Sequence, residues 1–151
     1  TPTSPKCGVC PWQNDCAGFQ KGIAETLPRR LKKKKTPTRH GVVYWITDDR
    51  GNILTRTRPD SGLLGATIEF PSTGWDQSDD VVKPPKTAVY VKTLTENVRH
   101  VFSHFTLILE IKCYEYKGTP PSDGYQWIRR DNVENAALSS LMRKVLKLSL
   151  S

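Results

Sequence analysis

Residues 105–116, FTLILEIKCYEY, carry the strongest strand pattern in the chain. Apolar side chains occupy every second position, and only Ile108 breaks the alternation. These apolar positions are Phe105, Leu107, Leu109, Ile111 and Cys113. Because successive side chains of a β-strand point to opposite faces of the sheet, the segment is predicted to be a strand that buries one face in a core.

Other strand signals lie before this segment. Residues 41–47, GVVYWIT, and residues 53–57, ILTRT, are rich in β-branched side chains, and the polar residues 48–52 between them supply turn chemistry. This pattern predicts a β-hairpin. Residues 87–93, TAVYVKT, predict a further short strand.

The C-terminal residues follow a helical pattern. Leu141, Val145 and Leu148 fall on one helical face, and either Ser139 or Ser140 can cap the helix at its N-terminus. Several strands closed by one helix predict an α+β fold.

The composition is that of an ordinary folded domain. The 151 residues are 36% hydrophobic and 9% aromatic, which suffices for a substantial core. No run approaches the roughly 20 apolar residues of a transmembrane helix, and the first residues, TPTSPKCGVCPW, lack the pattern of a secretory signal. We therefore expect a soluble chain from a reducing compartment, with no membrane partner.

Most of the net charge lies in residues 29–39, RRLKKKKTPTR. The chain has 23 Lys and Arg against 15 Asp and Glu, a formal charge of +8, and without the seven cations of this segment 16 bases oppose 15 acids. The seven cations are Arg29, Arg30, Lys32, Lys33, Lys34, Lys35 and Arg39. Such a block is typical of an extended, solvated connector or of a segment that contacts phosphate, and charge alone leaves both interpretations open.

Three of the four cysteines lie near the N-terminus. Cys7, Cys10 and Cys16 have the spacing C-x2-C-x5-C, which can hold one metal centre. Disulfide pairing is the competing interpretation, and the lack of a secretory signal disfavours it. Three thiolates are one fewer than a closed site needs. Cys113 lies on the apolar face of the predicted strand and is expected in the core.

Four features occur in the order found in one enzyme family. The cysteine spacing is followed by the connector LPRRLKKKKTPTR, then by LLGATIEFP at residues 63–71, then by HVFSHFTLIL at residues 100–109. In this combination the chain resembles the C-terminal portion of the MutY-type adenine DNA glycosylases, also called A/G-specific adenine glycosylases. The resemblance covers residues 1–148.

The resemblance implies three parts. These are the end of an iron–sulfur loop over residues 1–20, a basic interdomain connector over residues 21–39, and a MutT/Nudix-like 8-oxoguanine-recognition domain over residues 40–151. The family's loop holds a [4Fe–4S] cluster with the spacing C-x6-C-x2-C-x5-C, which places the fourth cysteine immediately before Thr1. We therefore expect the cluster in a full-length parent protein and an incomplete site, without cofactor, in this chain.

A MutT/Nudix-like mixed sheet with flanking helices raises the alternative of a nucleotide pyrophosphohydrolase. That activity requires the box G-x5-E-x7-R-E-x-x-E-E, whose carboxylates hold Mg²⁺. The chain has no Arg-Glu dipeptide, and Asp76, Asp79 and Asp80 come just before Pro84-Pro85, which leaves no room for the required helix. We expect the fold to be kept without the hydrolase site.

Residues 100–105, HVFSHF, indicate by themselves a turn between two strands. In the family this segment reads 8-oxoguanine, and Phe102, Ser103 and His104 match its Phe-Ser-His core. Oxidation of guanine at C8 turns N7 from an acceptor into an N–H donor and adds a carbonyl oxygen, and a serine hydroxyl can bond to either group. Ser103 is the first candidate to read the base. Phe102 would supply an apolar wedge or stacking plane, and His104 would orient the loop.

We therefore predict a DNA-binding, 8-oxoguanine-recognition fragment of an adenine DNA glycosylase in base excision repair. Its partners would be double-stranded DNA containing 8-oxoguanine opposite adenine and the N-terminal helix–hairpin–helix domain of the same protein. The catalytic acids belong to that domain in the family, so this chain is expected to have no catalytic residue and no activity alone.

Three further expectations concern contacts and location. The seven connector cations, and exposed bases such as Arg56, Arg58 and Arg99, are expected to contact DNA phosphates. The short connector indicates a bacterial protein, cytoplasmic and associated with the nucleoid. A basic module that docks an acidic protein partner is the remaining alternative.

Overall fold

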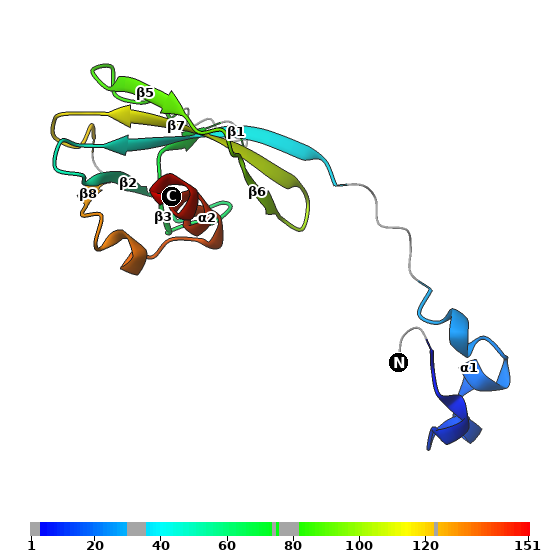
Figure 1. Cartoon of the computed structure of the whole chain (residues 1–151). Coiled ribbons are helices and arrows are strands. Elements are labelled where there is room, and N and C mark those ends of the chain that lie inside the picture. Colours follow the sequence, from blue (N-terminus) through cyan, green and yellow to red (C-terminus); the bar gives the residue numbers. More distant parts are fainter. Residues whose placement is uncertain (1–3, 30–35, 74, 76–81, 123) are drawn as a thin grey trace. The chain divides into compact units, whose positions relative to one another are not determined.

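The computed structural model describes residues 4–29, 36–73, 75, 82–122 and 124–151. Its internal contacts divide the chain into two compact units, Thr1–Lys35 and Thr36–Ser151. Figure 1 labels the two α-helices and most of the strands.

The first unit consists of short helical turns. These are η1 (Cys7–Val9), η2 (Gln13–Asp15), α1 (Ala17–Gln20) and η3 (Ala24–Thr26). None of its described residues is buried, and the large side chains of Val9 and Trp12 are 81% and 72% exposed. Because burial of apolar surface is the main force that holds a small domain together, this unit has little of its own to stabilise it.

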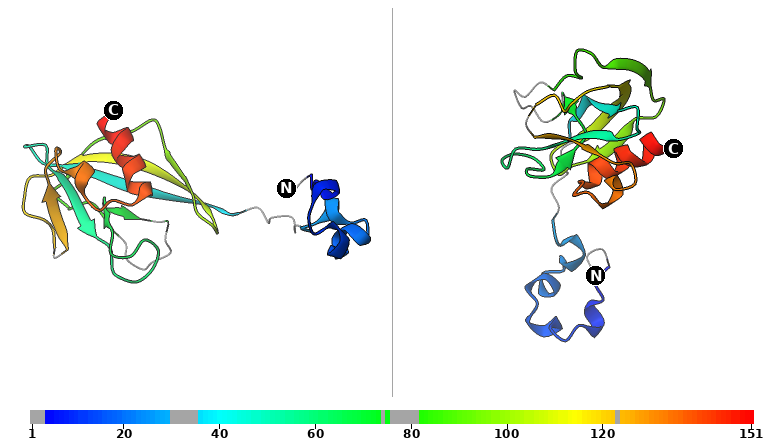
Figure 2. Two further views of the ribbon diagram at one scale, coloured as in Figure 1. Left: turned by 90° about the horizontal axis from the view of Figure 1, so that it is seen from below. Right: turned by 90° about the vertical axis from the view of Figure 1, so that its left-hand side faces the viewer.

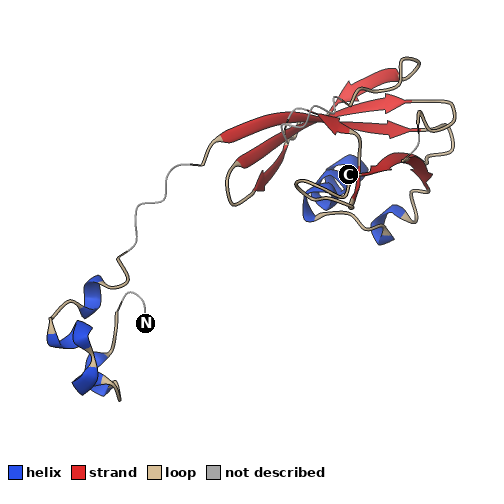
Figure 3. Cartoon of the chain, turned by 180° about the vertical axis from the view of Figure 1, so that it is seen from behind, coloured by secondary structure: helices blue, strands red, loops and turns tan. Residues whose placement is uncertain are grey.

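The second unit is built around one mixed β-sheet, shown in red in Figure 3. Its described strands are β1 (Thr38–Thr47), β2 (Ile53–Thr57), β3 (Ile68–Glu69), β4 (Ser72–Thr73), β5 (Val89–Thr93), β6 (Val98–Val101), β7 (Thr106–Glu115) and β8 (Tyr125–Ile128). The central order is β3-β2-β1-β7-β5, and β4 pairs with β1, β6 with β7 and β8 with β2.

The long strands β1 and β7 run parallel over ten residue pairs, from Thr38 opposite Thr106 to Thr47 opposite Glu115. The predicted alternation is confirmed, because Phe105, just before β7, and the four alternate apolar positions of β7 from Leu107 to Cys113 are all buried. The predicted hairpin is also confirmed as β1 and β2. The Asp48 carboxylate accepts the backbone N–H of Arg50 and of Asn52 in the connecting turn.

The C-terminal helix α2 (Ser140–Leu150) covers one face of the sheet, as the views in Figure 2 show. The Ser139 hydroxyl caps it by accepting the backbone N–H of Met142, as predicted for one of the two serines. Its buried side chains join the core with those of β7; they are Leu141, Met142, Val145 and Leu146. A second short helix, η4 (Val133–Asn135), precedes it. The predicted α+β class is confirmed.

Some elements differ from the sequence prediction. Strand β1 begins at Thr38, three residues before the predicted segment, so that the last residues of the basic block are paired in the sheet. The strands β3, β4 and β8 are not predicted, because two to four residues are too few to show a period, whereas β6 is the strand expected before the turn at residues 100–105. No helix in the described part of the chain has the length and apolar character needed to span a bilayer.

Gly41 marks a place where the backbone of β1 is closely approached. A Cβ atom there would lie 2.7 Å from the carbonyl oxygen of Thr73 and 3.1 Å from the Cβ of Trp75. A methyl group at this position would force β4 and Trp75 away from β1.

The Gly41→Ala variant is therefore expected to lose about 1–3 kcal/mol of unfolding free energy, the usual cost of overpacking. Urea denaturation followed by tryptophan fluorescence measures it. Gly8→Ala is the control, because its methyl would meet nothing within 4 Å. Equal stability of the Gly41→Ala variant and the wild type would contradict this packing.

Candidate nucleic-acid interface

The segment singled out in the sequence forms the tip of a β-hairpin. The last residue of β6, Val101, pairs with Thr106 of β7, and the Phe102 N–H donates to the Phe105 carbonyl at 2.8 Å. Ser103 and His104 are therefore the two residues of a tight turn, and both are exposed. We call residues 102–105 the recognition turn. Its tip lies at the surface, where a ligand can reach the hydroxyl and the imidazole.

The end of the basic segment lies beside this turn. Because β1 and β7 are parallel, their first residues share one end of the sheet, and the Thr106 N–H donates to the Pro37 carbonyl at 2.9 Å. Arg39, the last of the seven cations, places its guanidinium carbon 4.1 Å from the centre of the Phe105 ring. This arrangement is a cation–π contact at the base of the recognition turn.

Only some of the other predicted phosphate contacts lie among the described residues. Arg29 is exposed and belongs to the first unit. Arg30 and the four lysines at 32–35 lie outside the described residues. Arg99 is exposed on β6, next to the recognition turn.

Phe102 and Phe105 of the recognition turn form an aromatic cluster with Trp75 and His100. The Phe102 ring stacks on Trp75, with centroids 6.1 Å apart and planes at 10°. It also lies 4.7 Å from the Phe105 ring and 4.5 Å from the His100 ring. Phe102 is half-buried, so its side chain anchors the turn to the core.

His100 adds an imidazole ring to this cluster. Its Nδ1 atom is buried without a hydrogen-bond partner among the described residues. Burial, together with the nearby positive charge of Lys144, lowers the pKa of His100 below its ordinary value. Both effects disfavour the charged form of the imidazole.

Trp75 also contacts a buried ion cluster formed by Arg56, Arg58 and Glu69. Glu69 is fully buried, and its two carboxylate oxygens accept from Arg56 Nε at 2.7 Å and from Arg58 Nη1 at 2.6 Å. The Arg58 guanidinium carbon lies 4.9 Å from the Trp75 ring centre. The prediction that Arg56 and Arg58 are exposed phosphate contacts is wrong, because both are buried as partners of Glu69.

The cysteines do not form a metal centre in the described residues. Cys7, Cys10 and Cys16 are free thiols, and no group of three or more His, Cys, Asp or Glu side chains in the described part of the chain could hold a metal ion. A [4Fe–4S] cluster takes four ligands, so the residues that the structure describes do not fit it. Cys113 is buried in the core, as predicted, and burial raises the pKa of its thiol.

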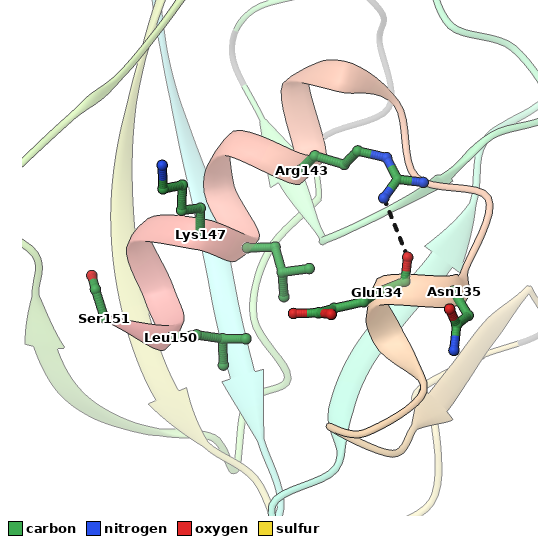
Figure 4. A pocket seen from close by; sticks show the side chains of 7 residues that line it. Glu134, Asn135, Arg143, Lys147, Leu150 and Ser151 are labelled. Atoms are coloured by element: carbon green, nitrogen blue, oxygen red, sulfur yellow. Dashed lines mark hydrogen bonds between the residues drawn. The ribbon is translucent and has the colours of Figure 1, made fainter.

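A separate hollow of about 570 Å³ lies between η4 and α2. Figure 4 shows Arg143 reaching from α2 to the backbone of Glu134, whose carbonyl oxygen accepts from Nη1 at 3.2 Å. Leu150 also lines this hollow, and none of the site residues predicted from the sequence is among its lining residues.

Comparison with known families assigns the second unit. The model of the NUDIX domain matches residues 42–148. The chain belongs to the NUDIX domain family. The model of the iron-sulfur binding domain of endonuclease III matches residues 1–16, the segment with the three cysteines of the predicted loop.

Individual relatives of this NUDIX domain protein agree with both matches. Human adenine DNA glycosylase is 26% identical over 171 residues, which covers 97% of this chain and 30% of the relative. The mouse adenine DNA glycosylase is 24% identical and covers 98% of this chain and 39% of the relative. The predicted resemblance to adenine DNA glycosylases is confirmed, and the chain spans about a third of these relatives' length.

Solved structures show the same fold. The C-terminal domain of mouse MUTYH, in its complex with human PCNA, aligns with a TM-score of 0.55 at 21% identity and covers 74% of this chain and 87% of that domain. The MutT protein of Methanosarcina mazei aligns with a TM-score of 0.59 at 15% identity and covers 76% and 94%. The predicted MutT/Nudix-like mixed sheet is confirmed.

The pyrophosphohydrolase machinery is not visible in the described residues. The carboxylate of Glu69, in the segment LLGATIEFP, accepts from two buried arginines. Residues 82–86 are not helical, and Asp76, Asp79 and Asp80 lie outside the described residues. The described residues therefore give no evidence of a helix whose carboxylates would bind Mg²⁺.

Loss of the Glu69 charge should be far more costly than loss of a surface charge. We expect Glu69→Gln to lower the unfolding free energy by about 3–5 kcal/mol, because two buried guanidinium groups would lose their counter-charge. Glu110→Gln is the matched control, since Glu110 meets Lys112 at 3.2 Å on the surface and its loss should cost no more than about 1 kcal/mol. Similar losses in urea denaturation would show that the buried cluster is not a stabilising element.

Proposed function

We propose that this chain is the 8-oxoguanine-recognition domain of an adenine DNA glycosylase that acts in base excision repair of 8-oxoguanine·adenine mispairs. The observation that carries the proposal is the exposed Ser103–His104 tip, held by a buried aromatic cluster beside the start of β1. The likeness to adenine DNA glycosylases over nearly the whole chain supports it.

Ser103 is the residue that reads the oxidised base. Its hydroxyl accepts from the N7–H of 8-oxoguanine or donates to the new carbonyl oxygen at C8. Ordinary guanine presents N7 as an acceptor and offers no oxygen at C8. The difference corresponds to a hydrogen bond made or missed, about 1.4 kcal/mol, which is a tenfold ratio of affinities.

Phe102 and His104 serve the same turn in different ways. Phe102 anchors the backbone next to Ser103 and leaves one edge of an apolar ring near the DNA. His104 is exposed at the tip and orients the turn or contacts the backbone of the strand. The connector cations, Arg39 included, neutralise phosphates of the bound duplex.

The division of labour follows from the family. The adenine pocket and the catalytic acids belong to an N-terminal helix–hairpin–helix domain, which is the partner of this chain and, with the fourth cysteine, completes the [4Fe–4S] site. The chain alone selects the strand opposite adenine and cleaves no glycosidic bond. Association with a bacterial nucleoid is part of the proposal, although the relatives compared above are mammalian.

A Nudix pyrophosphohydrolase is the second candidate, because the fold belongs to that family. Magnesium-dependent release of pyrophosphate from 8-oxo-dGTP by the chain would favour it. A module that docks an acidic protein through its basic segment would show salt-sensitive binding to a protein and none to DNA.

The chain is expected to bind duplex DNA weakly, with an affinity that falls steeply as salt rises because bound counterions are released. Replacing the four lysines at 32–35 by Gln should reduce the slope of log affinity against log salt by about 0.9 for each phosphate that the variant no longer neutralises. Fluorescence anisotropy measures both quantities. A variant with Lys6, Lys21, Lys83 and Lys86 changed to Gln loses the same charge elsewhere, and equal effects of the two variants would contradict a specific role of the connector.

The Ser103→Ala variant should lose preference for the oxidised base. We expect the ratio of affinities for 8-oxoguanine·adenine and guanine·adenine duplexes to fall about tenfold, the value of one hydrogen bond. Ser122→Ala, at an exposed serine in the loop before β8, is the control and should keep the wild-type ratio. An unchanged ratio in Ser103→Ala would remove Ser103 from the recognition of the base.

A further inference from the structure

We infer that Trp75 is a positioning residue for the recognition turn: it fixes Phe102, and through Phe102 the place of the Ser103 hydroxyl. The inference rests on the proposed function and adds a residue outside the turn that sets its selectivity. Trp75 lies 27 positions before Phe102, and it reaches the turn only through the fold.

Trp75 is itself held on several sides. It is only 1% exposed, and its indole N–H donates to the Ser72 hydroxyl at 3.1 Å. Its backbone carbonyl accepts from Arg39 Nη1 at 3.3 Å. The Arg58 guanidinium lies over its ring, and Arg58 is fixed in turn by the Glu69 carboxylate. Together these contacts hold the Trp75 side chain in one position.

Trp75 contacts the turn because its indole stacks nearly parallel to the Phe102 ring. The planes of Trp75 and Phe102 differ by 10°, so a shift of the indole displaces the Phe102 ring. Phe102 also packs on Phe105, which closes the turn by accepting the Phe102 N–H, and Arg39 lies over the Phe105 ring. The two residues that flank the tip are therefore both tied to Trp75, directly or through Arg39.

Ser103 follows Phe102 directly and has no packing of its own, because it is exposed. The position of its hydroxyl is thus set by the backbone of its neighbours. A hydrogen bond weakens steeply with distance and angle, so a turn held in one geometry distinguishes N7–H from N7 better than a mobile one. Preorganisation also lowers the cost of ordering the turn when it binds a base.

The test compares three variants near Trp75 with one control in the 151-residue chain. Trp75→Leu removes the stacking plane. Ser72→Ala removes only the indole hydrogen bond, and Trp75→Phe removes that bond and part of the ring but keeps an aromatic ring against Phe102. Trp45→Leu is the control, because Trp45 is a buried tryptophan that packs on Phe70, 4.9 Å away, and has no ring contact with the turn in the part of the chain that the structure describes.

The readout is the ratio of affinities for 8-oxoguanine·adenine and guanine·adenine duplexes, measured by fluorescence anisotropy below the melting temperature of each variant. We expect Trp75→Leu to lower this ratio about tenfold, as Ser103→Ala does, and Trp75→Phe and Ser72→Ala to lower it about two- to threefold. Trp45→Leu should lose stability and keep the wild-type ratio.

The outcomes separate the proposed function from the role of Trp75. If the wild-type chain shows no preference for the oxidised base, the proposed function fails. If the wild type discriminates and Trp75→Leu behaves as Trp45→Leu does, Trp75 is only a core residue and the inference is overturned. If circular dichroism shows that Trp75→Leu does not fold, Ser72→Ala decides, and a wild-type ratio in that variant overturns the inference.

Discussion

The parallel pairing of β1 with β7 fixes the position of the recognition turn relative to the start of β1. Ten consecutive pairs lock the two longest strands in one register, so the start of β1 and the start of β7 meet at one end of the sheet. The basic segment leads into the first strand and the recognition turn into the second. Residues 37–39 and the recognition turn, more than sixty positions apart in the sequence, are thereby brought together.

The same unit uses a buried carboxylate to hold its strands together. In the segment LLGATIEFP, Glu69 is buried and paired with two arginines. A carboxylate in that state stabilises the structure and has no free oxygen for a cation. Membership of the NUDIX family therefore describes the sheet and its packing, whereas function has to be argued from the exposed turn.

The sequence revealed the elements whose signal is local. The alternation of β7, the Asp48 turn and the Ser139 cap each lie within a few residues, and each is found in the structure. The Phe-Ser-His turn was found through resemblance to a family. Arg58 could not be placed in the same way, because its partner Glu69 lies on another strand and nothing nearby in the sequence indicates burial. Trp75 was missed for the same reason, since its contacts with Phe102 and Arg58 exist only after the chain has folded.

The antiparallel register of β6 on β7 restricts how the hairpin can vary in evolution. Val98 faces Leu109 and Val101 faces Thr106, and only the four residues 102–105 are left to reverse the chain. Insertion or deletion of a single residue in this hairpin would shift one strand by one position and turn every following side chain to the opposite face. Phe102 would then leave the indole and point to solvent. Homologues that keep the contact between Phe102 and Trp75 should therefore keep the length of the hairpin even where its individual residues differ.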